Sequence, residues 1–185
     1  MRIKEKQSGT TLIEIMVSIL VMAIGLLGLA SLQINAMKFQ KTASQRSEAT
    51  QASYDIAERM RSNWLMPKSI DNLALFRAAN ELKYTFNDEY SVSYSATHNP
   101  PHNCKASICD TGKIAANDVQ EWLRSLQQRL VDGTGMIVPV PGSASSTFDV
   151  TVMWKEQTLT ALDANCPPAA RAPIGVRCFN LRFSI

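Results

Sequence analysis

A long stretch near the amino terminus lacks charged residues. No Asp, Glu, Lys or Arg occurs from Ile15 to Met37, and residues 15–30 are almost purely apolar. A helix over such a stretch, at ~1.5 Å per residue, is long enough to span a hydrocarbon core of ~30 Å. The pattern therefore predicts a membrane-spanning helix at the start of the chain.

An amphipathic pattern follows this stretch. No proline occurs before Pro67, and small or apolar residues recur at helical spacing on one face: Ala49, Ala52, Ser53, Ile56, Met60 and Trp64. We expect one continuous helix from about Thr10 to Met66. Its first half, 10–37, is the transmembrane and assembly half, and its second half, 38–66, packs on a sheet. Met60 and Trp64 are expected in the core rather than in a ligand site.

The rest of the chain, 67–185, has the mixed pattern of a globular head. Helical patterns cover 71–82 and 117–131; Asn117 is expected to cap the second helix, whose apolar face contains Val119, Trp122, Leu123, Leu126 and Leu130. Strand-like alternation occurs at 84–94, 136–140, 148–154 and 179–185, and Pro139 favours a sheet edge. The order of these segments indicates an α+β fold, with an antiparallel sheet of about four strands covered by the long helix.

The composition fits one domain with an appendage. Of the 185 residues, 45% are apolar and 19% charged, which is enough for one sizeable core and excludes wholesale disorder. The net charge of +3 is far below the excess of a nucleic-acid-binding protein, so no nucleic acid partner is expected. Arg2, Lys4 and Lys6 precede the apolar stretch and favour an orientation with this end in the cytoplasm and the head outside.

Three interpretations compete for the N-terminal segment: a cleaved secretory signal, a permanent single-span anchor, or an anchor with a further use. The apolar run exceeds the ~7–15 residues of a secretory signal and has no clear small-residue cleavage site, which disfavours the first. A plain anchor does not account for Glu14, because an ionisable residue at the start of a membrane helix often marks a function. Snorkelling of Glu14 toward the headgroups is the structural alternative.

The segment Lys-Gln-Ser-Gly-Thr-Thr-Leu-Ile-Glu at residues 6–14, followed directly by the apolar run, resembles the class III signal of type IV pilins. The resemblance implies that a prepilin peptidase cuts between Gly9 and Thr10 on the cytoplasmic side, removes the leader 1–9 and methylates Thr10. It also implies that Glu14, the fifth residue of the mature chain, is the assembly carboxylate that meets a neighbour's terminal amine. The family most often has Phe where this chain has Thr10.

A second segment, from Leu130 through Gly133, Gly135 and Pro139 to the strand of Trp154, resembles minor pilins of the PilV type, also called type IV pilus modification proteins. This resemblance implies a structural subunit, not an enzyme, with no cofactor. Its implied partners are other minor pilins, the major pilin, a pilus tip adhesin and the inner-membrane assembly platform. Such a subunit helps initiate pilus assembly and supports twitching motility and surface attachment.

The resemblance also implies a location, first as a single-pass inner-membrane protein with a periplasmic head and then in the surface pilus, at its tip. A minor pseudopilin of a type II secretion system has the same leader and helix and is the closest alternative. A single-span periplasmic binding module that never leaves the membrane is the other alternative.

The four cysteines, Cys104, Cys109, Cys166 and Cys178, all follow the apolar helix and would face an oxidising periplasm. Among the three connectivities, 104–109 with 166–178 closes the shortest loops and is favoured, although a 104–178 link stays open. His98, His102, Cys104 and Cys109 also form the best metal candidate. We nevertheless expect no metal site, because zinc ligand pairs are normally further apart and exported cysteines more often oxidise.

Overall fold

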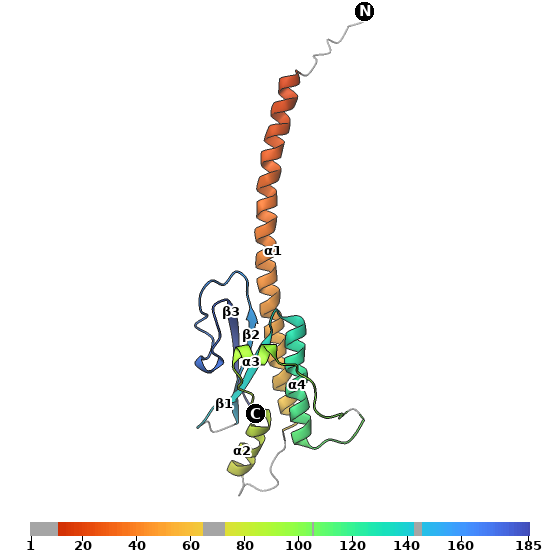
Figure 1. Ribbon diagram of the computed structural model, residues 1–185, viewed down its shortest axis with the longest axis vertical. Helices are drawn as coiled ribbons and strands as arrows, with labels where there is room; N and C mark the ends of the chain where they lie inside the picture. Colours follow the sequence, from red (N-terminus) through yellow and green to blue (C-terminus); the bar gives the residue numbers. More distant parts are fainter. Residues whose placement is uncertain (1–10, 65–72, 105, 143–145) are drawn as a thin grey trace, which may run out of the picture. The chain divides into compact units, whose positions relative to one another are not determined.

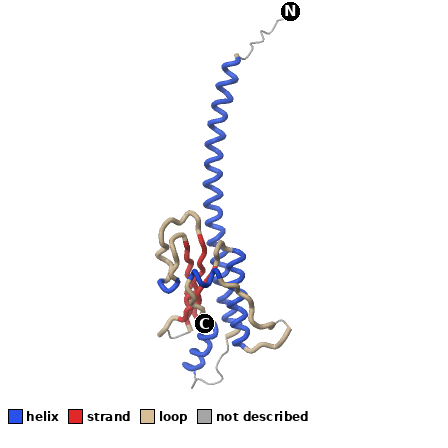
Figure 2. Tube along the Cα trace, viewed as in Figure 1, coloured by secondary structure: helices blue, strands red, loops and turns tan. Residues whose placement is uncertain are grey.

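The computed structural model describes residues 11–64, 73–104, 106–142 and 146–185. Along the chain it contains the helices α1 (Leu12–Ser62), α2 (Leu73–Tyr84), α3 (Tyr90–Ser95) and α4 (Thr111–Arg129), then the strands β1 (Thr134–Pro139), β2 (Thr147–Lys155) and β3 (Val176–Ser184) (Figures 1 and 2). A short 3-10 helix, Pro168–Ala170, precedes β3. The chain divides into two compact units, the first ending at Ala43 and the second starting at Ser44.

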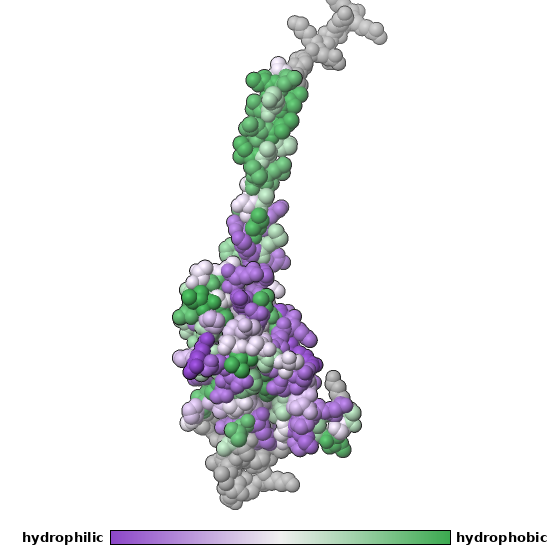
Figure 3. All heavy atoms as spheres, viewed as in Figure 1, coloured by the Kyte–Doolittle hydropathy of each residue, from purple (hydrophilic) through white to green (hydrophobic). Residues whose placement is uncertain are grey.

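The first unit consists of the N-terminal part of α1. All of its described residues except Thr42 are exposed, and the large apolar side chains from Leu12 to Phe39 cover its surface (Figure 3). The helix begins at Leu12 and ends at Ser62, close to the predicted bounds; Thr10, Met66 and Pro67 lie outside the described residues.

The second unit, from Ser44 onward, has its main core between the C-terminal part of α1, α4 and one face of the sheet. The predicted face of α1 is confirmed, because its buried residues are Ala49, Ala52, Ser53, Ile56, Ala57 and Met60. Trp64 is half-buried against the same core, with its ring edge-on to Phe148 at a centroid distance of 5.8 Å. The indole of the fully buried Trp122 donates a hydrogen bond to the carbonyl of Ala52 at 2.9 Å, which fixes α4 against α1.

Within the described residues, the sheet has three antiparallel strands in the order β1-β2-β3. The α+β, pilin-like arrangement is therefore confirmed, with one strand fewer in this part of the chain than expected. β1 is an edge strand, as Pro139 predicts. Alternate residues of β2 enter the main core: Phe148, Val150, Val152 and Trp154. On the opposite face, Met136 and Met153 pack with Tyr90 and Cys178 in a second apolar cluster.

The prediction of a strand at 84–94 is wrong. Only Phe86 makes an isolated bridge, to Ile137, and the chain then turns into α3. Tyr90 and Ser93 are buried at helical spacing, and the Tyr90 hydroxyl donates to the carbonyl of Asp132 at 3.1 Å. These contacts with residues far along the chain outweigh the local alternation of large and small side chains.

The predicted start of the second amphipathic helix is also wrong. α4 begins at Thr111, and Asp110 caps it by accepting a hydrogen bond from the Lys113 amide at 2.9 Å. Asn117 lies inside the helix, where it is buried and binds both main-chain groups of His102. The predicted apolar face is nevertheless buried from Val119 to Leu130. The other predicted helix is present as α2; Asp71 lies outside the described residues.

Candidate functional site

The first candidate site is the start of α1. Gly9 and Thr10 lie outside the described residues, whereas Glu14 sits in the first helical turn. Its amide donates to the carbonyl of Thr11 at 3.0 Å, and its own carbonyl accepts the Ser18 hydroxyl at 2.7 Å. The Glu14 residue itself is exposed, so its carboxylate is accessible to another molecule.

The helix surface that follows Glu14 is unusual for a folded chain. Large apolar side chains are 51–78% exposed from Leu12 to Phe39. In the described part of the chain, α1 is the one helix that is long and apolar enough to cross a membrane. A contiguous apolar surface of this size marks a membrane or protein contact rather than a face in water. The arrangement can therefore anchor the chain in lipid or bind other apolar helices.

Both disulfides of the second unit have the short-loop pairing. The structure joins Cys104 to Cys109, with a Cα–Cα distance of 5.4 Å, and Cys166 to Cys178, at 5.1 Å. The second bridge fastens the connection before β3 to the strand itself, and nearby Asp163 accepts the Cys178 amide at 3.1 Å. Both bridges act as cross-links that restrict loops.

The loop with the two histidines lies beside α4, and its two cysteines are joined in a disulfide. His98 is buried, with Nδ1 at 3.1 Å from Gln120 and Nε2 at 2.8 Å from the carbonyl of Ser93. The sulfur atoms of Cys104 and Cys109 are bonded to each other and offer no thiolate. Among the residues that the structure describes, no three His, Cys, Asp or Glu side chains are grouped to hold a metal ion.

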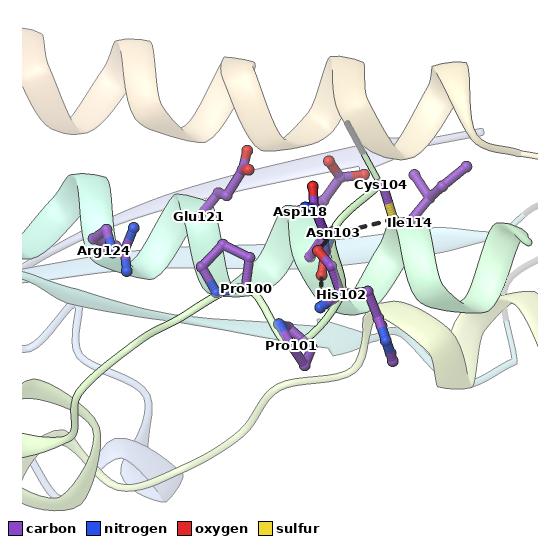
Figure 4. Close-up of a pocket in the computed structure, with 10 residues that line it drawn as sticks. Pro100, Pro101, His102, Asn103, Cys104, Ile114, Asp118, Glu121 and Arg124 are labelled. Atoms are coloured by element: carbon purple, nitrogen blue, oxygen red, sulfur yellow. Dashed lines mark hydrogen bonds between the residues drawn. The ribbon is translucent and has the colours of Figure 1, made fainter. Parts of the chain in front are cut away.

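A pocket of about 620 Å³ lies between this loop and α4, lined by residues 100–104 of the loop and by Ile114, Asn117, Asp118, Glu121 and Arg124 of the helix (Figure 4). Asn117 forms one wall, with its amide bound to the carbonyl of His102 at 2.5 Å. Arg124, a further lining residue, donates to the carbonyl of His98 at 2.9 Å and to the Asn99 side chain. These contacts hold the loop on the helix, so the pocket walls are largely fixed by the fold.

An ion-pair cluster joins α1 to α4 beside this pocket. Arg59 lies 3.0 Å from Asp55, 3.4 Å from Asp118 and 3.1 Å from Glu121. The Tyr84 hydroxyl donates to Asp118 at 3.0 Å, and burial raises the pKa of both of these groups above the ordinary values. The cluster unites groups from three helices, and its role in the described fold is to tie them together.

This cluster was not anticipated from the sequence. Asp55 and Arg59 lie at a spacing of four, and Asp118 and Glu121 at a spacing of three, both of which are typical of exposed helix faces. Only the packing of α1 on α4 brings the two pairs together. These two spacings are the local sequence features that relate to the cluster, and neither indicates that the two pairs meet.

Comparison with known proteins finds a family model that matches the start of the chain. Residues 4–30 match the family model described as the prokaryotic N-terminal methylation motif. No curated protein and no solved structure matches the chain. The match covers the leader region, Glu14 and the first apolar turns of α1. It indicates a type IV pilin-like or pseudopilin chain that is processed by prepilin peptidase, anchored in a membrane and assembled with other pilins.

Proposed function

We propose that this chain is a minor pilin of a type IV pilus, a structural subunit that helps to initiate pilus assembly and supports twitching motility and surface attachment. The observation that carries the proposal is the methylation motif at residues 4–30, which ends in a helix whose apolar surface is exposed. The resemblance of the 130–154 segment to PilV-type minor pilins supports the minor rather than the major subunit.

Processing prepares the assembly site. Prepilin peptidase cuts after Gly9, removes the leader 1–9 and methylates the new amino terminus at Thr10. The cut creates a cationic amine near the Glu14 carboxylate, at the end of a helix that enters lipid. Opposite charges attract strongly where the dielectric constant is low, and either charge alone is costly there. The carboxylate of Glu14 in an incoming subunit is therefore stabilised most when it pairs with the terminal amine of a subunit already in the fibre.

The apolar half of α1 then exchanges one apolar environment for another. In the membrane its side chains contact lipid, and in the fibre they contact the helices of neighbouring subunits. Because both environments are apolar, the transfer costs little hydrophobic free energy, and the interaction of Glu14 can decide the register. Residues 10–37 serve as the anchor and assembly half, 38–66 as the amphipathic half and 67–185 as the periplasmic head.

The partners follow from this role. The subunit would meet prepilin peptidase and the inner-membrane assembly platform first, and then other minor pilins, the major pilin and a tip adhesin. It would start as a single-pass inner-membrane protein and end in the surface pilus, near its tip.

The test replaces Glu14 by alanine and follows both processing and incorporation. Mass spectrometry of the mature Glu14→Ala chain should still show a methylated Thr10 terminus, whereas the amount in sheared fibres should fall at least tenfold. Ser18→Ala is the matched control, because Ser18 is exposed one turn further along and its hydroxyl bonds only its own helix. Wild-type amounts of Glu14→Ala chain in sheared fibres would refute the proposed role of Glu14.

A minor pseudopilin is the second candidate, because the same methylation motif occurs in that class. It predicts that the chain is absent from sheared surface fibres and that its deletion blocks secretion of exoproteins. A periplasmic binding module predicts an unprocessed chain that begins at Met1. Sequencing of the mature amino terminus separates this last alternative from the other two.

A further inference from the structure

A second pocket lies within the unit that starts at Ser44, between α1 and one end of the sheet. It has a volume of about 280 Å³ and is lined by Arg46 of α1, Trp154 of β2, Arg177, Cys178 and Phe179 of β3, and Asn165 of the preceding connection. Trp154 and Arg177 are partners in the register of β2 and β3. The described residues of the lining include two arginines and a tryptophan, and none of them is an aspartate or a glutamate.

The indole of Trp154 has an unsatisfied donor. Trp154 is 1% exposed, and its Nε1–H has no acceptor among the residues that the structure describes. The other fully buried indole, that of Trp122, donates to the Ala52 carbonyl. Buried donors are nearly always paired in folded proteins, so an acceptor is expected at Trp154.

Arg46 supplies an accessible charge on the same pocket. It is exposed, and no ion pair of its guanidinium occurs within the described part of the chain. The hydrogen bond from Arg177 is the main cause that lowers the pKa of Glu156, and the positive charge of Arg46 adds to it through space. Arg46 is therefore free to bind an acceptor that enters from outside.

Arg177 is held in place by acids outside the lining. Its Nε donates to Glu156 at 2.8 Å, and its Nη1 lies 3.6 Å from Asp163. Asp163 also accepts the amides of Cys178 and Asn165, at 3.1 Å each. The acids around the pocket thus have donors of their own, and the remaining donors of the lining point to a ligand that accepts hydrogen bonds.

The balance of charge selects the class of ligand. Arg46, Arg177, Glu156 and Asp163 together carry no net formal charge, so a ligand with one negative charge is opposed less than a phosphate with two. A carboxylate has one charge and two acceptor oxygens, which suit a guanidinium and an indole N–H together.

We propose that this pocket binds an Asp or Glu side chain of a neighbouring subunit, with Arg46 and the Trp154 indole as donors and Arg177 as supporting charge. The proposal rests on the proposed function, because assembly places other subunits beside α1. It adds a contact of the head to the contact made by Glu14.

The experiment uses the processed full-length chain in detergent micelles, labelled with ¹⁵N at its three tryptophan indoles. The probe is the capped peptide acetyl-Ala-Glu-Ala-amide, and the matched control is acetyl-Ala-Gln-Ala-amide, which differs by one carboxylate. The signals are assigned with Trp64→Phe and Trp122→Phe variants, so that Trp154 is never altered. We expect a saturable downfield shift of the Trp154 indole proton with the Glu peptide and none with the Gln peptide.

Variants of arginine test the site itself. Arg46→Gln should lower the affinity for the Glu peptide at least tenfold. Arg171→Gln should leave this affinity unchanged, because the exposed Arg171 pairs with Glu89 away from the pocket. The proposal fails if the Trp154 signal does not move, if both peptides move it equally, or if Arg46→Gln binds like the wild type. An equal response to inorganic phosphate would mean an adventitious ion only.

This binding measurement is independent of fibre assembly. If the Trp154 signal responds as in the wild type but the chain is absent from fibres, the binding site at the pocket is supported and the minor pilin role is refuted. If incorporation into fibres depends on Glu14 but the Trp154 signal does not respond, the minor pilin role is supported and the binding site at the pocket is refuted.

Discussion

Gly135 lies in β1 where the sheet approaches the side chain of Trp122. A Cβ atom at this position would lie 2.8 Å from Cζ3 of Trp122 and 2.9 Å from the carbonyl oxygen of Thr151. Neither neighbour can move easily. Trp122 is fully buried and its indole donates a hydrogen bond to the Ala52 carbonyl. The oxygen of Thr151 belongs to the backbone of β2, where Thr151 lies opposite Met136. Gly135→Ala should therefore strain the contact between α4 and the sheet.

The expected cost follows from packing. Insertion of a methyl group into a close-packed core costs about 1–3 kcal/mol. At roughly 3 °C per kcal/mol for a domain of this size, the midpoint of thermal unfolding should fall by about 3–9 °C. The large buried surface of Trp122 makes the upper part of this range the expected one.

Near-ultraviolet circular dichroism of the full-length chain in detergent measures this midpoint under oxidising conditions. Gly112→Ala is the control, because its added Cβ meets only the Asp110 side chain, at 3.3 Å, and alanine favours the first turn of α4. Gly112→Ala should change the midpoint little or raise it. A Gly135→Ala midpoint within 1 °C of the wild type would refute the close approach of Trp122 and β1.

Three further predictions concern the second unit. Asp110→Ala removes the cap of α4 and should lower the free energy of unfolding by about 1 kcal/mol in a urea titration. Replacement of Cys166 and Cys178 by serine opens the longer of the two cross-linked loops and should cost about 3 kcal/mol, against about 2 kcal/mol for the shorter bridge; equal losses would contradict the loop-entropy argument. The hydrogen bond from Arg177 lowers the pKa of Glu156, so its stabilising effect is complete above the pKa of an unfolded glutamate and is lost as the pH falls through the lower folded value. In the Glu156→Gln variant, the free energy of unfolding should therefore fall less steeply between about pH 5 and pH 3 than in the wild type. An unchanged slope in acid titrations would contradict the stabilising role of the Glu156 carboxylate.

Long elements with a strong period could be predicted from the sequence, whereas short ones could not. The buried face of α1 and the apolar face of α4 repeat over several turns, so each was recognisable without its neighbours. The alternation of Tyr90, Val92 and Tyr94 covers too few residues to distinguish a strand from a helical turn. Burial of Tyr90 and Ser93 against the sheet decides for the helix.

The start of α4 shows a second limit. Thr111 and Gly112 are typical of a turn, and Asn117 is a common capping residue that precedes an apolar run. The actual cap, Asp110, stands directly before Thr111 and Gly112, so its surroundings are as typical of a turn as of a helix start. The Arg59 cluster and the Trp154 pocket likewise depend on the packing of separate elements, which no local pattern contains.

The two parts of α1 distribute their side chains in opposite ways. From Ala49 to Met60 the buried positions include three alanines and a serine, which allow close packing on α4 and the sheet. From Leu12 to Phe39 the largest apolar side chains are exposed, although such residues are normally the first to be buried. Because no described residue of the chain covers them, their cover has to come from lipid or from other chains. This conclusion does not depend on the methylation motif, and it agrees with the membrane anchoring and the assembly with other pilins that the motif indicates.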